Sequence, residues 1–367
     1  MPIIPDRFRR TPLIVCCLLA ACGGGGGGGG GAPSEPPAQQ PPSPAPTLQQ
    51  RIDAARATVT GNATCNEITP FYWEIGDKTG VLASGTGGNQ SGTAPTAVTA
   101  MPIASSTKWL FSTYVLEKQR GALSDTDVAM LNFTSGYANN NGACEGSQTV
   151  AACLSGSGSY GGRRGDAISW AGTKFYYDGG HMQVLASRIG LADDDTAKLA
   201  ADMKAVLGAD LDFSFDTPYL AGGGRATAAG YGLFLRKLLA GQYTFMVGAL
   251  GSNSVCAFTN SNECLALYSP INQSRPMGGN DISSERWHYS LGHWVEDDPV
   301  VGDGAFSSSG KWGFYPWVDR SKTWYGVLAR YDTANVAVGT DPRQYSYITS
   351  GNCGRLIRRA WVEGRAR

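Results

Sequence analysis

The spacing of apolar residues changes along the chain from a helical to a strand-like period. Apolar residues recur every three or four positions over residues 48–59, which predicts an amphipathic helix. Residues 71–75 and 80–83 are rich in apolar, aromatic and β-branched residues and flank an Asp77-Lys78 turn, which predicts two strands. The folded part therefore begins with a helix followed by a hairpin.

The remaining periodic segments complete the predicted architecture. Helices are expected from a start near Ser105 and over residues 180–189, 194–207, 226–239 and 343–361, and strands over residues 287–295, 312–318 and 323–331. Strands thus lie at both ends of the chain, with helices and loops between them. The economical interpretation is an α+β fold in which one sheet, made from both chain ends, is covered by the first and last helices and lies beside a mostly helical subdomain.

The first 47 residues have the composition of an export signal and a tether. Residues 1–21 combine three arginines with a short apolar run, which is typical of a signal peptide. Their ending, Leu19-Ala20-Ala21-Cys22, resembles the lipobox of bacterial lipoproteins and implies lipidation of Cys22; a plain signal peptide cleaved nearby is the alternative. Residues 22–47 are rich in Gly and Pro and predict a flexible tether, so that residues 48–367 form the folded domain.

The lipobox resemblance also implies a location. An exported protein with a lipidated Cys22 would be anchored to a membrane of the cell envelope through its lipid. Gly23 is not the aspartate that retains lipoproteins at the inner membrane in the family rule. The resemblance therefore favours the periplasmic side of the outer membrane.

Composition and charge exclude several classes of protein. The chain of 367 residues is 42% apolar, which is too apolar for a disordered chain, and it balances 30 basic against 30 acidic residues. A neutral chain of this kind is not expected to bind nucleic acid through a basic surface. The three histidines His181, His288 and His293 are scattered, and no Cys-x-x-Cys pair occurs, so neither a metal nor a cofactor is predicted.

The cysteine count suggests disulfides in the exported domain. Of nine cysteines, two lie in the signal peptide and one is the lipidation candidate, which leaves six. Six cysteines allow 15 connectivities. Proximity along the chain favours the pairs Cys144–Cys153 and Cys256–Cys264, which leaves Cys65–Cys353 to join the two ends of the domain.

One short motif carries nucleophilic chemistry. Ser105-Ser106-Thr107-Lys108 fits Ser-x-x-Lys, and a spacing of three residues on a helix places an amine beside the serine hydroxyl. A serine becomes a good nucleophile only when a base stands next to it. Ser308 to Lys311 has the same spacing, but it lies among glycines and serines before a predicted strand, where the pair would not share a face.

Five further stretches agree in order with one known family. Residues 171–179 resemble the motif P-G-T-x-F-x-Y-S-N of the serine β-lactamase and penicillin-binding protein family, class C-like branch, with Tyr177 on its tyrosine. Residues 131–137, before this motif, and residues 222–239, 289–294 and 314–319, after it, resemble further segments of the same family. The resemblance covers residues 48–361 and implies a β-lactamase-like fold and an acyl-enzyme mechanism.

The resemblance also implies roles for individual residues. Ser105 would be the acylated nucleophile, and Lys108 and Tyr177 would share the role of base, with the nearby ammonium favouring the phenolate of Tyr177. Tyr176 takes the place of Tyr177 if the alignment is off by one. The third motif, which supplies a backbone N–H to the oxyanion, falls on Ser308-Ser309-Gly310 or, in a competing register, on Lys311-Trp312-Gly313.

Two departures from the family pattern bear on the substrate. Gly179 stands where the family has an asparagine that contacts both the lysine and the substrate amide, and in the first register the third motif lacks a cation. These changes favour a hydrolase for small or uncharged ester, amide or peptide substrates. A β-lactamase or D-alanyl-D-alanine carboxypeptidase is one alternative, and a catalytically inactive binding module on the same fold is another. His181 is expected to be a buried histidine, and Arg163 and Arg164 to lie in a solvated loop.

Overall fold

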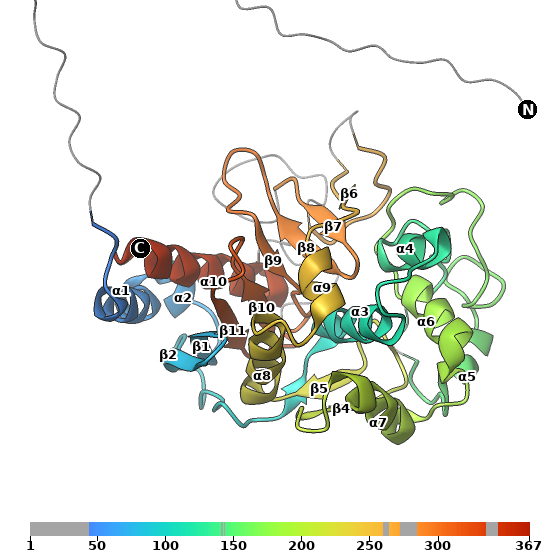
Figure 1. Ribbon diagram of the computed structural model, residues 1–367, viewed down its shortest axis with the longest axis horizontal. Helices are drawn as coiled ribbons and strands as arrows, with labels where there is room; N and C mark the ends of the chain where they lie inside the picture. Colours follow the sequence, from blue (N-terminus) through green and yellow to red (C-terminus); the bar gives the residue numbers. More distant parts are fainter. Residues whose placement is uncertain (1–43, 141, 143, 260–263, 272–284, 335–343) are drawn as a thin grey trace, which may run out of the picture. The chain divides into compact units, whose positions relative to one another are not determined.

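Strands from the two ends of the chain pair within one sheet (Figure 1). The structure is a computed structural model that describes residues 44–140, 142, 144–259, 264–271, 285–334 and 344–367. The strands are β1 (Phe71–Asp77), β2 (Gly80–Gly87), β6 (Val255–Cys256), β7 (His288–Ser290), β8 (His293–Glu296), β9 (Ala305–Ser307), β10 (Tyr315–Val318) and β11 (Tyr325–Ala329). They form an antiparallel sheet in the order β2-β1-β11-β10-β9-β8-β7-β6, in which Tyr72 of β1 lies opposite Ala329 of β11.

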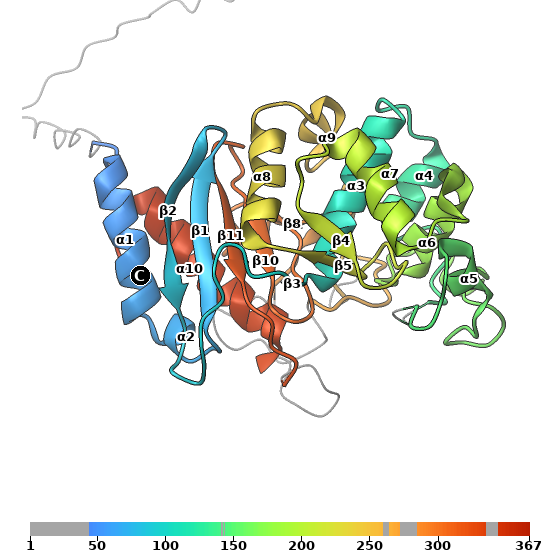
Figure 2. The same ribbon diagram turned by 90° about the horizontal axis from the view of Figure 1, so that it is seen from below.

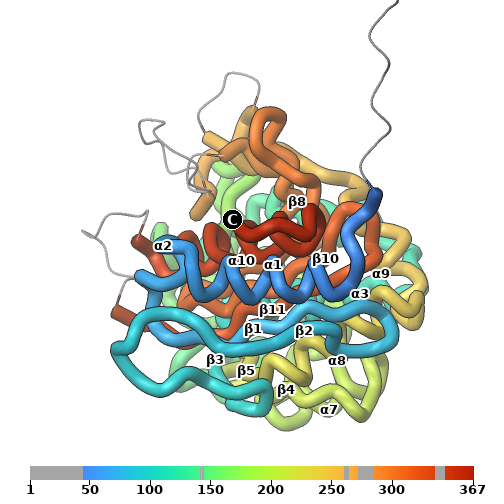
Figure 3. The backbone as a smooth tube through the Cα atoms, turned by 90° about the vertical axis from the view of Figure 1, so that its left-hand side faces the viewer, coloured from blue at the N-terminus to red at the C-terminus, as the bar shows by residue number. Residues whose placement is uncertain are grey.

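Helices cover both faces of this sheet, as Figure 2 shows. The first helix α1 (Leu48–Gly61) and the last helix α10 (Ser346–Glu363) pack against each other on one face, where Figure 3 shows them side by side. The short helix α2 (Ala63–Asn66) joins α1 to β1. Helix α8 (Ala228–Leu239) packs against β1 and β11 from the other side. The predicted α+β architecture is thereby confirmed, because both ends contribute strands and the terminal helices cover them.

The middle of the chain forms a helical region beside the sheet. It contains η1 (Ala104–Ser106), α3 (Thr107–Lys118), α4 (Asp125–Leu131), α5 (Val150–Ser155), α6 (Gly180–Ala186), η2 (Ser187–Leu191), α7 (Thr196–Leu207) and α9 (Thr244–Ala249). A small sheet of β3 (Met101–Pro102), β5 (Gly224–Ala226) and β4 (Phe213–Phe215) lies between this region and the main sheet. Residues 107–116 of α3 are buried on every side, as expected of a helix that runs through a core. A helix packed in this way gives the residues at its amino end a rigid support.

Two predicted strands have different bounds in the structure. The predicted strand over residues 287–295 is a tight hairpin, because Leu291 and Gly292 both adopt positive φ values, 39° and 84°, and reverse the chain between β7 and β8. The predicted strand over residues 312–318 begins only at Tyr315. Its first residues form a turn instead, in which Gly313 adopts a φ of 102° and donates to the carbonyl of Gly310.

The three predicted disulfides are present. Cys65–Cys353 joins α2 to α10 with a Cα–Cα distance of 5.0 Å, and Cys144–Cys153 and Cys256–Cys264 each close a short loop. The predicted signal peptide, the lipidation candidate Cys22 and nearly all of the predicted tether lie outside the described residues. Within the described residues, no helix has both the length and the apolar character needed to cross a bilayer.

Candidate active site

Ser105 lies in η1, directly before the buried helix α3. The residue before it, Ala104, adopts a φ of 43°, a conformation that non-glycine residues rarely hold without support from their surroundings. The support comes from hydrogen bonds on both sides: the N–H of Ile103 donates to the carbonyl of Gly224 at 2.9 Å, and the hydroxyl of Ser106 donates to the carbonyl of Ser308 at 2.6 Å. Ser105 itself is partly exposed between buried neighbours, and these hydrogen bonds fix the backbone on both sides of it.

Lys108 reaches back to the nucleophile from the first turn of α3. Its Nζ lies 2.9 Å from the Oγ of Ser105 and 2.5 Å from the carbonyl oxygen of Ala221. The side chain is buried, and burial lowers its pKa to about 7, although the negative charge of Asp178 opposes the shift. A large fraction of the amine is therefore neutral near pH 7 and can accept a proton from the serine.

Tyr177 approaches Ser105 from the loop before α6. Its hydroxyl forms a hydrogen bond with the Ser105 side chain, and its ring centroid lies 4.7 Å from the Nζ of Lys108. The ring also stacks on Trp294 of β8, with centroids 5.4 Å apart, which fixes its orientation. Burial raises the pKa of Tyr177, so the expected phenolate is disfavoured. The expected stabilisation of the phenolate by the Lys108 ammonium is therefore outweighed by burial, whereas the shared role of base stays a prediction.

Tyr176, the alternative to Tyr177, has different surroundings. Its ring packs against Tyr160, Trp170 and Tyr268, and its hydroxyl forms a hydrogen bond with that of Tyr160. Adjacent residues of an extended segment point to opposite sides, which accounts for the separation of the two tyrosine side chains. The geometry therefore selects Tyr177 as the tyrosine of the site.

Asp178 is a member of the site that the sequence interpretation missed. Its Oδ1 accepts the backbone N–H groups of Asn140 at 2.9 Å and of Gly180 at 2.7 Å. Burial raises the pKa of the Asp178 carboxyl to about 6, against the opposing effect of these hydrogen bonds and of the Lys108 charge. At neutral pH the carboxylate is ionised and attracts the proton of Lys108. The available signal was an acidic residue directly after Tyr177, where the family motif has a serine.

His181 is a buried histidine, as expected. One ring nitrogen lies 2.7 Å from the hydroxyl of Ser135 and the other lies 3.0 Å from the carbonyl oxygen of Tyr176. Burial lowers the pKa of His181 to about 3, which keeps the ring neutral. Its ring stacks on Phe133 with centroids 5.1 Å apart. These contacts fix the backbone that carries Tyr177, and they do not include Ser105.

The third motif reaches Ser105 in the first of the two predicted registers. The hydroxyl of Ser308 donates to the carbonyl of Ser105 at 3.1 Å. Gly310 packs so closely against Ile103 that a Cβ at this position would overlap the carbonyl group of Ile103. Lys311, the cation of the competing register, is exposed in the turn that follows. The contacts with residues 103–105 come from the first register, and the choice between the two registers stays a prediction.

The backbone of the third motif supplies hydrogen-bond donors. The N–H groups of Ser308 and Gly310 point to carbonyls of residues 316 and 314 at 3.3 Å and 2.7 Å. Because N–H groups alternate in direction along a strand, those of Ser309 and Lys311 point away from β10. Together with the N–H of Ser105 they are candidate donors to an oxyanion. In the described part of the chain, the buried hydroxyl of Ser309 has no hydrogen-bond partner.

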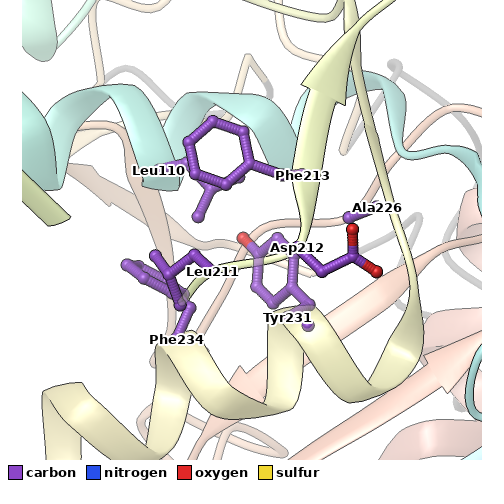
Figure 4. Close-up of a pocket in the computed structure, with 8 residues that line it drawn as sticks. Leu110, Leu211, Asp212, Phe213, Ala226, Tyr231 and Phe234 are labelled. Atoms are coloured by element: carbon purple, nitrogen blue, oxygen red, sulfur yellow. The ribbon is translucent and has the colours of Figure 1, made fainter. Parts of the chain in front are cut away.

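Two hollows lie near these elements without containing the three central residues. Figure 4 shows a small apolar space between α3, β4 and α8, lined by Leu110, Phe213 and Phe234 among others; it has no room for a water molecule, and we assign it to core packing. A larger groove of about 690 Å³ runs along Met101 and Pro102, just before Ser105 in the chain.

Comparison with known proteins identifies the fold. No family model and no curated protein matches the chain. Among solved structures, a candidate β-lactamase from Bacteroides dorei DSM 17855 is 19% identical, with a TM-score of 0.51 over 80% of this chain and 95% of that one. The structure of EstCE1, described as a hydrolase with promiscuous acyltransferase activity, is 12% identical, with a TM-score of 0.52 over 83% of this chain and 98% of that one. Unliganded simvastatin synthase LovD from Aspergillus terreus is 12% identical, with a TM-score of 0.50 over 84% of this chain and 99% of that one.

At these identities the likeness establishes the fold alone. The chain has a β-lactamase-like fold, as the motif resemblance implied. The roles of individual residues rest on the geometry described above. Within that fold, three side chains from two separate stretches of the chain meet at Ser105: the nucleophile candidate itself, Lys108 and Tyr177.

Proposed function

We propose that this protein is a serine hydrolase that cleaves an ester or amide bond through an acyl-enzyme on Ser105. The observation that supports this most directly is the 2.9 Å contact between the Ser105 hydroxyl and a buried lysine amine whose pKa is lowered to about 7. Burying a charged lysine ammonium costs free energy, so the neutral amine is favoured at this position. The neutral amine is also the form that can accept the serine proton and activate the nucleophile.

The mechanism follows from the protonation states of the three groups. The neutral amine of Lys108 accepts the proton of Ser105 as Oγ forms a bond to the substrate carbonyl carbon. The carbonyl oxygen becomes negatively charged and accepts hydrogen bonds from the backbone N–H groups of Ser105 and the third motif. The Tyr177 phenol donates its proton to the leaving group and regains one from the lysine ammonium, while the bond from carbon to the leaving group breaks.

The second half of the cycle uses the same groups with water. The leaving group departs as an alcohol or amine and leaves an ester on Ser105. Water then forms a bond to the carbonyl carbon of this ester and gives a proton to Lys108. The bond from carbon to Oγ breaks, the lysine ammonium returns that proton to Oγ, and the acid leaves. An alcohol in place of water would yield a new ester, so the site is compatible with acyl transfer as well as hydrolysis.

The two departures from the family pattern support uncharged substrates. In the described structure the third motif beside Ser105 presents the hydroxyl of Ser308 in place of a cation, and Gly179 brings no amide side chain into the site. A carboxylate on the substrate would have no cationic partner in the third motif, and an anion without a partner is costly to desolvate. We therefore propose small esters or amides as substrates, in preference to β-lactams or D-alanyl peptides.

Export and lipid anchoring complete the proposal. The arginines of residues 1–21, the apolar run and the sequence Leu19-Ala20-Ala21-Cys22 support cleavage before Cys22 and its acylation. A lipidated Cys22 followed by a Gly- and Pro-rich tether would hold the domain in the cell envelope, on the periplasmic side of the outer membrane. Mass spectrometry of the amino-terminal peptide tests this, with Cys22→Ala as the control: an unmodified Cys22 in the mature protein contradicts the anchor.

The activity is tested with a fluorophosphonate probe and a panel of chromogenic substrates. The probe should label Ser105 in the folded domain, as mapped by peptide mass analysis, and Ser105→Ala should abolish both labelling and turnover of p-nitrophenyl esters. Tyr177→Phe should lower turnover, whereas its neighbour Tyr176→Phe provides a matched control that should not. Rapid turnover of nitrocefin would favour the β-lactamase alternative. Ser105→Ala with undiminished activity on every ester, or no activity in either protein, would favour a binding module.

A further inference from the structure

The space beside Gly179 is filled by a side chain from a distant part of the chain. A Cβ placed on Gly179 would overlap the phenol of Tyr219, at its hydroxyl and at the adjoining ring carbons. Tyr219 lies in the loop between β4 and β5, and its hydroxyl is 3.5 Å from the carbonyl oxygen of Asn140. The glycine and the tyrosine are therefore sterically matched: a side chain at one position excludes the ring at the other.

Hydrogen bonds hold Tyr219 in this place from both sides. Its own carbonyl accepts the N–H groups of Gly222 at 3.2 Å and Gly223 at 2.7 Å, which closes a tight turn. The buried amide of Gln183, on α6, donates to the carbonyl of the residue before Tyr219 at 2.7 Å and accepts the N–H of the residue after it at 3.1 Å. Helix α6 follows Gly179 directly, so the same helix positions both members of the pair.

The ring also lies next to the groups that would carry out the chemistry. Ala221, two residues after Tyr219, supplies the carbonyl that accepts a hydrogen bond from the Lys108 amine. Burial and the neighbouring charge of Asp178 raise the pKa of Tyr219, so its hydroxyl is a neutral phenol. The space beside Gly179 is therefore occupied by an aromatic ring with a single hydroxyl, where an amide side chain would offer both a donor and an acceptor.

We propose that Tyr219 is a specificity-determining residue that selects acyl chains without an amide group next to the reacting carbonyl. This inference rests on the proposed hydrolase function and names its substrate class: simple carboxylic esters with an apolar acyl chain. An apolar chain packs against the ring without loss, whereas a substrate amide buried there would leave its N–H and C=O incompletely paired. Discrimination of this kind is strong because an unpaired buried polar group costs more than an added contact gains.

Two substrates that release the same leaving group, p-nitrophenol, isolate the effect of an amide in the acyl chain. p-Nitrophenyl pentanoate and the p-nitrophenyl ester of N-acetylglycine have acyl chains of equal length, and only the second carries an amide. Wild type should prefer the pentanoate in kcat/KM. Tyr219→Ala combined with Gly179→Asn should shift the ratio of the two kcat/KM values toward the acetylglycine ester by roughly tenfold, because the new amide can pair with that of the substrate.

The single variants test the steric match independently of catalysis. Gly179→Asn alone should lower Tm by roughly 3 to 6 °C, because it forces overpacking against Tyr219, and the added Tyr219→Ala should restore much of that loss. Gly92→Asn is the matched control, since a Cβ there meets no atom within 4 Å. If Gly179→Asn is as stable as Gly92→Asn, or if the double variant keeps the wild-type substrate ratio, the inference is refuted. Absence of Ser105-dependent turnover in wild type would instead refute the proposed function. The Tm comparison would still test whether Gly179 and Tyr219 are sterically matched, because it needs no catalytic activity.

Discussion

The protonation of Lys108 should control the rate at which Ser105 is acylated. Burial lowers the pKa of this amine from its ordinary value of 10.5 to about 7. The shift corresponds to roughly 5 kcal/mol against the charged form, at about 1.4 kcal/mol per pKa unit. Because only the neutral amine can accept the serine proton, kcat/KM should be level above pH 7 and should fall about tenfold for each pH unit below it.

The assay is the release of p-nitrophenol from p-nitrophenyl acetate, followed from about pH 5 to about pH 9. Asp178→Asn is the sharpest companion variant. Both backbone hydrogen bonds to Asp178 end on Oδ1, which an asparagine also possesses, so the variant removes the charge and keeps the contacts. Without the carboxylate the Lys108 ammonium loses an attraction that raises its pKa, and the midpoint of the profile should move to lower pH.

Two results would refute this reasoning about Lys108. A rate that does not depend on pH across this range would mean that no group with a pKa near 7 acts in acylation. A midpoint that moves to higher pH in Asp178→Asn would mean that the titrating group is not a cation held beside that carboxylate. Lys108→Arg serves as the control for loss of the base, because a guanidinium keeps its proton throughout this range.

Three predictions concern the scaffold and are read by denaturant unfolding. Gly310→Ala should lower the unfolding free energy by about 1 to 3 kcal/mol and reduce kcat, because its Cβ overlaps the backbone beneath it; an unperturbed kcat would contradict the close packing. Replacing both Cys65 and Cys353 with Ala should remove about 2 to 5 kcal/mol while KM stays the same, and an unchanged unfolding midpoint would contradict a stabilising role. Arg358→Met should cost about 3 to 5 kcal/mol, because Asp303 loses its arginine partner and Glu296 keeps only Arg355; retained stability would contradict this account.

The elements that were predicted well are those whose signal is local. Helix α1 repeats its apolar positions at helical spacing over four turns, and β1 and β2 flank a short turn at Asp77, so each could be recognised from neighbouring residues. The hairpin at Leu291-Gly292 was read as one strand because its aromatic residues continue through the turn. Strand β9 was not predicted at all, since three buried residues, Ala305–Ser307, are too short to show a period.

The candidate site divides in the same way. The spacing from Ser105 to Lys108 is a local pattern, and Tyr177 could be found because a motif surrounds it. Tyr219 could not be found, because its role depends on a contact with Gly179, 40 residues earlier in the chain, that only the folded loop creates. The protonation of Tyr177 was predicted in the wrong direction for a related reason: the neighbouring ammonium was visible in the motif, whereas the burial that outweighs it was not.

The two departures from the family pattern act on the substrate in the same direction, and the structure explains why they occur together without harming the acylation groups. Gly179 lacks an amide side chain and the third motif, in the first register, lacks a cation, yet neither absent group is needed to hold Ser105 or Lys108. The serine backbone is held by its contacts with Ser308, and the amine by Ala221. Under the proposed function, recognition can therefore change at these two positions while Ser105 and Lys108 stay in place, which is why we propose acyl groups that bring neither a carboxylate nor an amide.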